Sequence, residues 1–237
     1  MLNDRGASLF LPVIRWLWSK SAAHVFLSHR LRNEYLKTYH MRSRLPVVIP
    51  NALDNEWLNL PLKSRQERTK EVVFVGRWSG EKGMNLIQAA FHERRLGDKR
   101  TCHVYGANDV PLDDTAVVFH GWASHDHLRY VISDAELLVL PSYAEAYPNV
   151  LIEALACGTP FVSSDVAGMP DIAEQSKAGL TFPTGSVDAF ISCIETVLDD
   201  DSLWLAMSNR GYAWAQQQSL AHIQRLWGDL IAQIAVE

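Results

Sequence analysis

Apolar residues gather in short unbroken runs of Val, Leu, Ile and Phe, and the segments between these runs carry apolar residues three and four positions apart. Unbroken runs of about four to eight residues are typical of strands buried on both faces, whereas the wider spacing is typical of amphipathic helices. The predicted strands cover residues 72–76, 101–106, 116–121, 137–141, 160–165 and 179–183. Strands alternating with helices predict an α/β fold, a doubly wound parallel sheet of the Rossmann-like type.

The rest of the pattern is helical or mixed. Helices are predicted in the gaps between the strands, at 82–95, 124–135, 148–158, 169–175 and 186–200. The tail from Asp201 onward is also helical, and Trp204, Trp214 and Trp227 are expected to pack it onto the body. Upstream, a helical N-terminal stretch precedes a strand in "AHVFLS", a helix in "HRLRNEYLKTY" and a strand in "LPVVIPN". Residues 54–71 look like a polar connector.

The N-terminal segment "ASLFLPVIRWLW" has the apolar character of a signal-peptide core. Pro12 and Arg15 interrupt it, and no small-residue cleavage site follows. We therefore predict one face of a packed helix. Because no apolar run approaches the roughly 20 residues of a membrane-spanning helix, no such span is predicted.

Charge is distributed unevenly along the chain. Its 237 residues are 48% apolar and carry a net charge of −5. Residues 1–70 hold 12 Lys and Arg against 5 Asp and Glu, a net +7, while the remainder holds 10 against 22, a net −12. The basic segment 28–44 could contact an anionic surface such as phosphate-bearing lipid; a solvated helix face is the alternative. Nucleic acid is disfavoured, because the whole chain is acidic and lacks a nucleic-acid motif.

Metal and disulfide chemistry is not predicted. Cys102, Cys157 and Cys193 form no CxxC pair, which favours buried thiols in a reducing cytoplasm. The aspartates at 199–201 resemble a metal-binding DxD, but they fall at a helix–helix junction where a helix cap is expected.

In an open α/β sheet, ligands bind beyond the carboxyl ends of the strands. After the first strand of the series, "GRWSGEKG" offers Gly76 for a sharp turn, Arg77 and Lys82 as cations, and Gly83 for close backbone approach. This set suits a diphosphate. It matches neither the dinucleotide fingerprint GxGxxG nor the P-loop GxxxxGK[ST].

The stretch "YAEAYPNVLIEAL" places Glu145 and Glu153 on either side of a Tyr-Pro-Asn turn. Pro148 is predicted as the first helical residue, with Tyr147 or Ala146 as the cap, so that free N–H groups form an anion site. The carboxylates should lie on the order of 10 Å or more apart, beyond the spacing of a hydrolase acid/base pair. They suit the two ends of a nucleotide-sugar. Alternatively, Glu145 interacts with the helix dipole and Glu153 is a surface residue.

Three segments together resemble a known family: "VGRWSGEKG", "LLVLPSYAEAYPNVLIEALACGTPFVSSDVAGMPDI" and "GLTFPTGSVDAF". They are similar to the C-terminal, donor-binding domain of the GT-B glycosyltransferases of family 4, the glycosyl transferases group 1 domain. The resemblance spans roughly residues 20 to 235 and includes the Glu-x7-Glu element of that family. Two positions depart from the family pattern: Asn51-Ala52 replaces Asn-Gly at the hinge, and Ala167-Gly168 replaces Gly-Gly.

The resemblance implies a role for each matching residue. Arg77 and Lys82 hold the donor diphosphate and neutralise the leaving nucleotide, and Glu145 contacts the donor sugar; these three are the catalytic candidates. Glu153 binds the ribose hydroxyls. The remaining donor-binding candidates approach the sugar, phosphate or base through the backbone: Gly76, Gly121, Ala146, Tyr147, Pro148, Asn149 and Val150. Transfer is expected to be retaining and metal-free, with no cofactor besides the nucleotide-sugar substrate.

The resemblance also implies a domain organisation. Residues 1–53 correspond to the end of an N-terminal acceptor domain and the hinge, 54–200 to the nucleotide-sugar-binding domain, and 201–237 to helices that cross back. The acceptor is expected to be a saccharide or glycolipid, as in bacterial surface polysaccharide or glycolipid synthesis, at a cytoplasmic location that includes the inner membrane face.

Two other functions remain as alternatives. The chain could be a fragment or donor-binding half that needs a separate N-terminal domain chain. A nucleotide-sugar epimerase shares the architecture but needs acid and base residues that we do not find.

Overall fold

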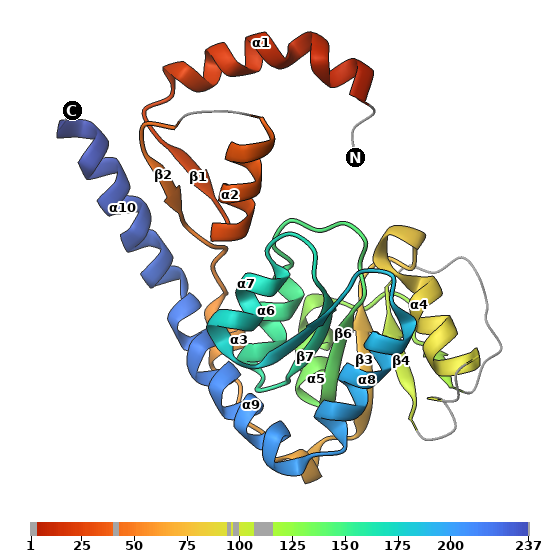
Figure 1. Ribbon diagram of the computed structural model, residues 1–237. Helices are drawn as coiled ribbons and strands as arrows, with labels where there is room; N and C mark the ends of the chain where they lie inside the picture. Colours follow the sequence, from red (N-terminus) through yellow and green to blue (C-terminus); the bar gives the residue numbers. More distant parts are fainter. Residues whose placement is uncertain (1–3, 40–42, 94–95, 97–99, 107–115, 237) are drawn as a thin grey trace.

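The computed structural model describes the chain except for residues 1–3, 40–42, 94–95, 97–99, 107–115 and 237 (Figure 1). Its larger part is a six-stranded sheet in which all neighbouring strands are parallel, in the order β5-β4-β3-β6-β7-β8. The strands are β3 (Lys70–Val75), β4 (Cys102–Tyr105), β5 (Val117–Phe119), β6 (Ala135–Leu140), β7 (Phe161–Ser164) and β8 (Gly179–Phe182). Every strand predicted for this sheet forms.

Helices cover both faces of the sheet (Figure 1). They are α3 (Asn55–Leu58), α4 (Met84–Gln88) with its π-helical continuation η3 (Ala89–Glu93), α5 (His125–Ser133), α6 (Asn149–Ala156), α7 (Met169–Ser176), α8 (Val187–Leu198) and α9 (Asp201–Ala215), with short 3-10 turns η1 (Arg65–Glu67), η2 (Gly80–Lys82) and η5 (Gln216–Gln218). The central strands β3 and β6 are apolar on both faces because both are covered; Val73, Phe74 and Leu138 are fully buried. The predicted doubly wound α/β fold is confirmed.

The order of the strands reverses between β3 and β6, which places the ligand-binding crevice at their carboxyl ends. The loops that follow these two strands contact each other directly, since Tyr143 N–H donates to the Glu81 carbonyl at 2.8 Å. Gly83 has φ +76°, and a Cβ there would lie 2.0 Å from the Pro141 carbonyl oxygen. Only glycine permits this approach.

The smaller part of the molecule contains α1 (Asp4–Lys20), β1 (His24–Phe26), α2 (His29–Thr38) and β2 (Pro46–Val48), with β1 and β2 parallel. The long helix α10 (Leu220–Val236) leaves the larger part and runs beside this small sheet (Figure 1). Ile49, Ile223 and Leu230 form a separate buried cluster there. The strand, helix and strand predicted before residue 53 all form, whereas the domain boundaries at 53 and 200 stay predictions. None of the described helices is long and apolar enough to cross a membrane.

Three sequence predictions are wrong or incomplete in this region. The connector 54–71 is structured, because α3 buries Trp57 and the chain then buries Arg68. The N-terminal helix exposes most of its described large apolar side chains instead of packing them. In the tail, Trp204 is buried and Trp214 packs against the core, but Trp227 is 43% exposed.

The aspartates at the junction of α8 and α9 act as predicted. The Asp200 carboxylate accepts a hydrogen bond from Leu203 N–H at 2.9 Å and caps α9. An N-terminal carboxylate also interacts favourably with the helix dipole.

Candidate functional site

The loop after β3 supplies two of the predicted cations. Gly76 ends the strand with φ +156°, and its carbonyl oxygen would lie 1.8 Å from a Cβ at Gly106, so the loops after β3 and β4 touch. Arg77 is exposed, and among the described residues none forms an ion pair or hydrogen bond with it. Lys82 lies further along, in η2. Within the described part of the chain, the guanidinium of Arg77 is therefore available to an anion.

Lys82 and Glu145 meet at the crevice. Lys82 Nζ lies 2.5 Å from Glu145 Oε1, and Ser142 Oγ donates to the same oxygen at 2.9 Å. The side chains are 22% and 10% exposed, so the pair is shielded from water on most sides. The structure thus joins two of the predicted catalytic residues across 63 positions of sequence. The sequence pattern carried no signal for this contact.

Helix α6 begins at Asn149, not at Pro148 as predicted. Pro148 is the N-cap with extended backbone angles of φ −72° and ψ 118°, and neither Tyr147 nor Ala146 caps the helix. The carbonyl of Pro148 accepts from Leu151 N–H at 3.2 Å. The N–H groups of Asn149 and Val150 precede this bond, so they point out of the helix at the positive end of its dipole.

Two neighbouring segments fix the loop before α6. The Ala146 carbonyl accepts from Gly168 N–H at 3.0 Å, and the buried Tyr147 ring packs against Gly168. From the hinge, Asn51 Nδ2 donates to Asn149 Oδ1 at 2.7 Å. The Ala146 carbonyl is therefore already occupied within the protein.

Ala167 stands where the family pattern has glycine, and its φ of +51° lies in the left-handed region. That conformation is uncommon for a residue with a Cβ and is strained. The loop after β7 therefore keeps the backbone turn that glycine would favour, even though the glycine is absent.

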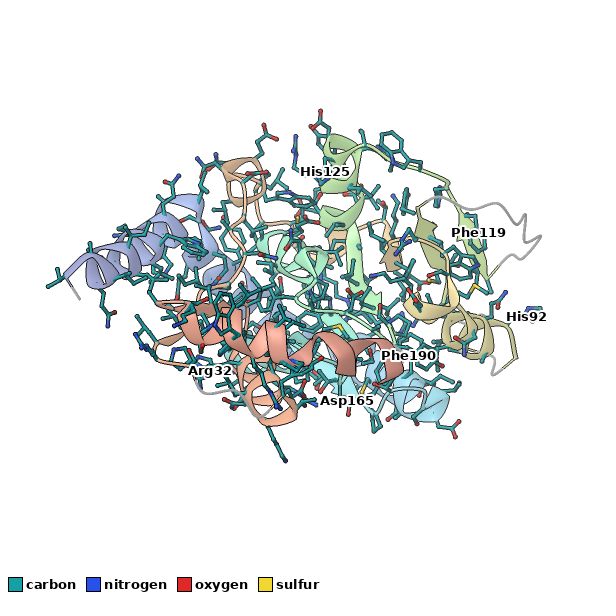
Figure 2. The ribbon with its side chains drawn as sticks, turned by 90° about the horizontal axis from the view of Figure 1, so that it is seen from above. Arg32, His92, Phe119, His125, Asp165 and Phe190 are labelled. Atoms are coloured by element: carbon teal, nitrogen blue, oxygen red, sulfur yellow. The ribbon has the colours of Figure 1, made fainter. Side chains whose placement is uncertain are left out.

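Glu153 lies on α6 behind the loop and is partly buried. Burial raises the pKa of this carboxyl to about 7; His125 opposes the shift and Asp54 adds to it. His125 is the first residue of α5 and is labelled in Figure 2. The side chain is thus not the freely solvated surface residue of the alternative interpretation.

Replacing Glu153 by glutamine should remove a pH-dependent loss of stability. The folded pKa of about 7 lies above the ordinary value of 4.5, so the folded state holds this proton more tightly than the unfolded chain. The contribution of the protonated Glu153 carboxyl to the free energy of unfolding is fully present below pH 4.5 and is lost as the pH rises through 7. We expect Glu153→Gln to be the more stable protein at neutral to alkaline pH, by about 2 kcal/mol.

Urea denaturation across this pH range checks the expectation. Glu174→Gln, at an exposed position, is the control. Its free energy of unfolding should change with pH in the same way as that of the wild type. If the free energy of unfolding of Glu153→Gln also changes with pH as in the wild type, the assigned pKa is wrong.

An apolar pocket of about 230 Å³ lies beside Arg77 at the ends of β3 and β4. Its lining residues are Val75, Gly76, Arg77, Tyr105, Gly106, Trp122, Ala123 and Leu128. Gly121 has φ +70°, and its carbonyl accepts from Gly106 N–H at 2.8 Å, which holds the segment carrying the exposed Trp122 next to β4. The size and the planar aromatic lining suit a nucleobase.

Sequence reasoning missed Tyr105, which lines this pocket and is 4% exposed. Its position directly before the glycine at the end of β4 was an available signal. The His120 ring stacks on Tyr105 at 4.4 Å between centroids, and His120 Nε2 lies 2.9 Å from His103 Nδ1. Burial and neighbouring positive charge lower the pKa of both imidazoles, which favours the neutral, hydrogen-bonded pair. His120 therefore stacks on the pocket-lining Tyr105 while remaining exposed itself.

Comparison with known proteins decides the family. Residues 69–200 match the model described as "Glycosyl transferases group 1". The chain belongs to this family, as its motifs predicted. The roles of the individual site residues stay predictions.

Relatives and solved structures agree with this assignment. The chain is 28% identical over 228 residues to glycogen synthase of Mycobacterium tuberculosis, covering 90% of this chain and 52% of that protein. It is 26% identical over 250 residues to 2-deoxystreptamine glucosyltransferase of Streptomyces kanamyceticus, covering 93% and 65%. The Anabaena protein Alr3699/HepE in complex with UDP shares the fold, with a TM-score of 0.81, 19% identity, and coverage of 98% of this chain and 70% of that one. The chain thus spans between half and two thirds of the length of these curated relatives.

Proposed function

We propose that this chain binds a nucleotide-diphosphate-sugar and serves in retaining, metal-independent transfer of a hexosyl group to a saccharide or glycolipid acceptor. One observation carries the proposal. The Lys82–Glu145 pair, Arg77 and the N-terminus of α6 all lie beyond the carboxyl ends of β3 and β6. Among the described residues, Arg77 has no ion-pair or hydrogen-bond partner. The glycosyltransferase relatives, and the neighbouring structure whose title names UDP-glucose, support this substrate class.

The arrangement suggests a role for each group. The base lies in the pocket bordered by Tyr105 and Trp122. Glu153, in its ionised form, accepts hydrogen bonds from the ribose hydroxyls. The diphosphate lies between Arg77 and Lys82 and faces the N–H groups of α6, where positive charge stabilises it.

Transfer develops negative charge on the leaving nucleotide as the bond to the sugar breaks. The two cations and the helix dipole are fixed before the reaction, so they stabilise this charge without reorganising. Such groups can take the part that a divalent cation plays in other transferases. Glu145, held by Lys82 and Ser142, is placed to accept a hydrogen bond from a donor-sugar hydroxyl.

Isothermal titration with UDP, GDP and ADP tests donor binding, and we expect one of the three to bind. A transfer assay with the matching sugar, with the product anomer read by NMR and with or without EDTA, tests retention and metal independence. If none of the three nucleotides binds, the site assignment is wrong; if the anomer inverts or EDTA abolishes transfer, the mechanism is wrong.

A second candidate is a donor-binding half that turns over only with a separate acceptor-domain chain. The observation that favours it is coverage, because the chain spans 52% of the M. tuberculosis glycogen synthase. Nucleotide binding without donor hydrolysis or transfer would support this candidate.

The wider setting is part of the same proposal. We place the activity in bacterial surface polysaccharide or glycolipid synthesis, in the cytoplasm, with peripheral contact at the inner membrane face through the basic segment 28–44. The charge of that segment supports the membrane contact.

A further inference from the structure

The outward face of the part of α1 whose side chains are described, residues 12–20, is apolar and uncovered. Val13, Ile14, Trp16 and Leu17 are 55%, 41%, 59% and 55% exposed. At 3.6 residues per turn, these four positions span about 160° of the helix circumference. The face is therefore a continuous apolar stripe, which we call the α1 stripe.

The opposite face of α1 is fixed to the protein. The Trp18 ring stacks on His24 with 3.6 Å between centroids and on Tyr35 with 5.4 Å. Arg15 donates to the Tyr39 carbonyl at 3.0 Å. These contacts orient the helix, so the α1 stripe points away from α2 and β1. Figure 1 shows α1 at the end of the small unit farthest from the six-stranded sheet.

Basic side chains are concentrated in the part of the chain that carries the α1 stripe. Residues 12–44 contain seven Lys and Arg but only one acid, Glu34, which is already paired with Arg30 at 3.0 Å. Lys20, Lys37 and Arg44 are exposed, and within the described part of the chain no carboxylate pairs with them.

We propose that α1 lies flat on an anionic lipid surface. In this arrangement the α1 stripe enters the boundary between headgroups and acyl chains, and exposed cations of the same part of the chain, such as Lys20 in the last turn of α1, contact lipid phosphates. A helix with Trp, Leu and Ile on one face and basic residues around it has the composition of an interfacial membrane helix. An apolar contact and a basic patch together bind a bilayer more stably than either alone.

Charge argues against a second copy as the occupant of the α1 stripe. Pairing two stripes would bring two net positive surfaces together, which is unfavourable, whereas anionic lipid neutralises the same charges. A lipid surface satisfies both the apolar and the basic groups.

This inference extends the proposed contact of segment 28–44 by adding the apolar element that the segment lacks. It rests on that part of the proposed function alone. Vesicle binding is measured without nucleotide or acceptor, so its failure is distinguishable from failure of the proposed transfer activity.

Co-sedimentation with phosphatidylcholine vesicles, with and without about 30% phosphatidylglycerol, tests the proposal. We expect binding to the anionic vesicles that weakens as salt is raised. The Trp16→Ala/Leu17→Ala variant should bind at least tenfold more weakly. Leu205→Ala is the matched control, since Leu205 on α9 is also 55% exposed and should bind like the wild type.

A second pair of variants tests the cations. Lys20→Glu/Lys37→Glu should lose the preference for anionic vesicles, whereas Arg210→Glu, at an exposed position of α9, should keep it. If the double alanine variant does not fold by circular dichroism, Leu17→Ser replaces it, with the same expectation.

Unchanged vesicle binding by a folded stripe variant would overturn the proposal. So would a wild-type dimer in light scattering that becomes monomeric in the stripe variant, because a second copy would then cover the stripe.

Discussion

Replacing Arg68 by methionine should lower the free energy of unfolding by about 3 kcal/mol or more. Arg68 is 6% exposed, and its guanidinium lies beneath the sheet, 5.0 Å from the Trp204 ring centroid. Burial lowers its pKa to about 10, so it remains charged at neutral pH. Methionine fills a similar volume but donates no hydrogen bond.

The large expected effect follows from what the guanidinium joins. Nη1 donates to Ser133 O, Ala135 O and Thr159 Oγ1 at 3.1, 2.7 and 2.7 Å, and Nη2 donates to Cys157 O and Gly158 O at 2.9 and 3.1 Å. The acceptors lie just before β6 or β7 or, for Ala135, at the first residue of β6. One side chain therefore bonds to the segments where two central strands begin. Without it, buried carbonyl groups lose their donors, and each such loss costs about 1 kcal/mol or more.

Urea denaturation measures the Arg68 effect, and Arg129 is the matched control. Arg129 is 17% exposed, but its partners Glu56 and Asp126 are 67% and 79% exposed. Because exposed ion pairs contribute little, Arg129→Met should cost about 1 kcal/mol or less. Arg68→Lys should recover only part of the loss, because an ammonium group cannot span acceptors on two sides. Equal effects of Arg68→Met and Arg129→Met would refute this interpretation.

The sheet was predictable from sequence because its evidence is local. Strands such as β3 and β6 are buried on both faces, so they appear as unbroken apolar runs, and their order of helix and strand then specifies the topology class. The first residue of α6 was predicted one position too early. Proline is common as a first helical residue, but the extended ψ of Pro148 moved the start by one position to Asn149.

The features that sequence reasoning missed depend on which other part of the chain, if any, packs against a residue. The apolar spacing of α1 predicts an amphipathic helix, but it does not say whether a protein surface covers Trp16. The same holds for Trp227 in the tail. In the site, the motif indicated Lys82 and Glu145 separately; their contact requires β3 and β6 to be neighbours in the sheet, which the motif does not specify.

Replacing Lys82 by alanine should weaken binding of the cognate nucleoside diphosphate by about 10- to 100-fold, or 1.4 to 2.8 kcal/mol. The ammonium group is 22% exposed at the mouth of the crevice, where a phosphate can replace the Glu145 carboxylate as its partner. A charge-assisted contact to phosphate in such a shielded place is stronger than one in water. Binding of the corresponding nucleoside, which lacks phosphate, should be unchanged.

The Lys82 variant also removes the partner of Glu145, and the design must separate this from a loss of phosphate binding. Lys63 is the matched control, because it pairs with Asp134 at the opposite end of the sheet, with side chains 32% and 24% exposed. Lys63→Ala should leave nucleotide affinity unchanged in titration calorimetry. In Lys82→Ala/Glu145→Ala, the unpaired carboxylate is gone but affinity should remain low, since the lost cation is what the diphosphate requires. Affinity within twofold of wild type in Lys82→Ala would show that Lys82 does not bind the diphosphate. Full recovery in the double variant would show that Lys82 acts only by neutralising Glu145.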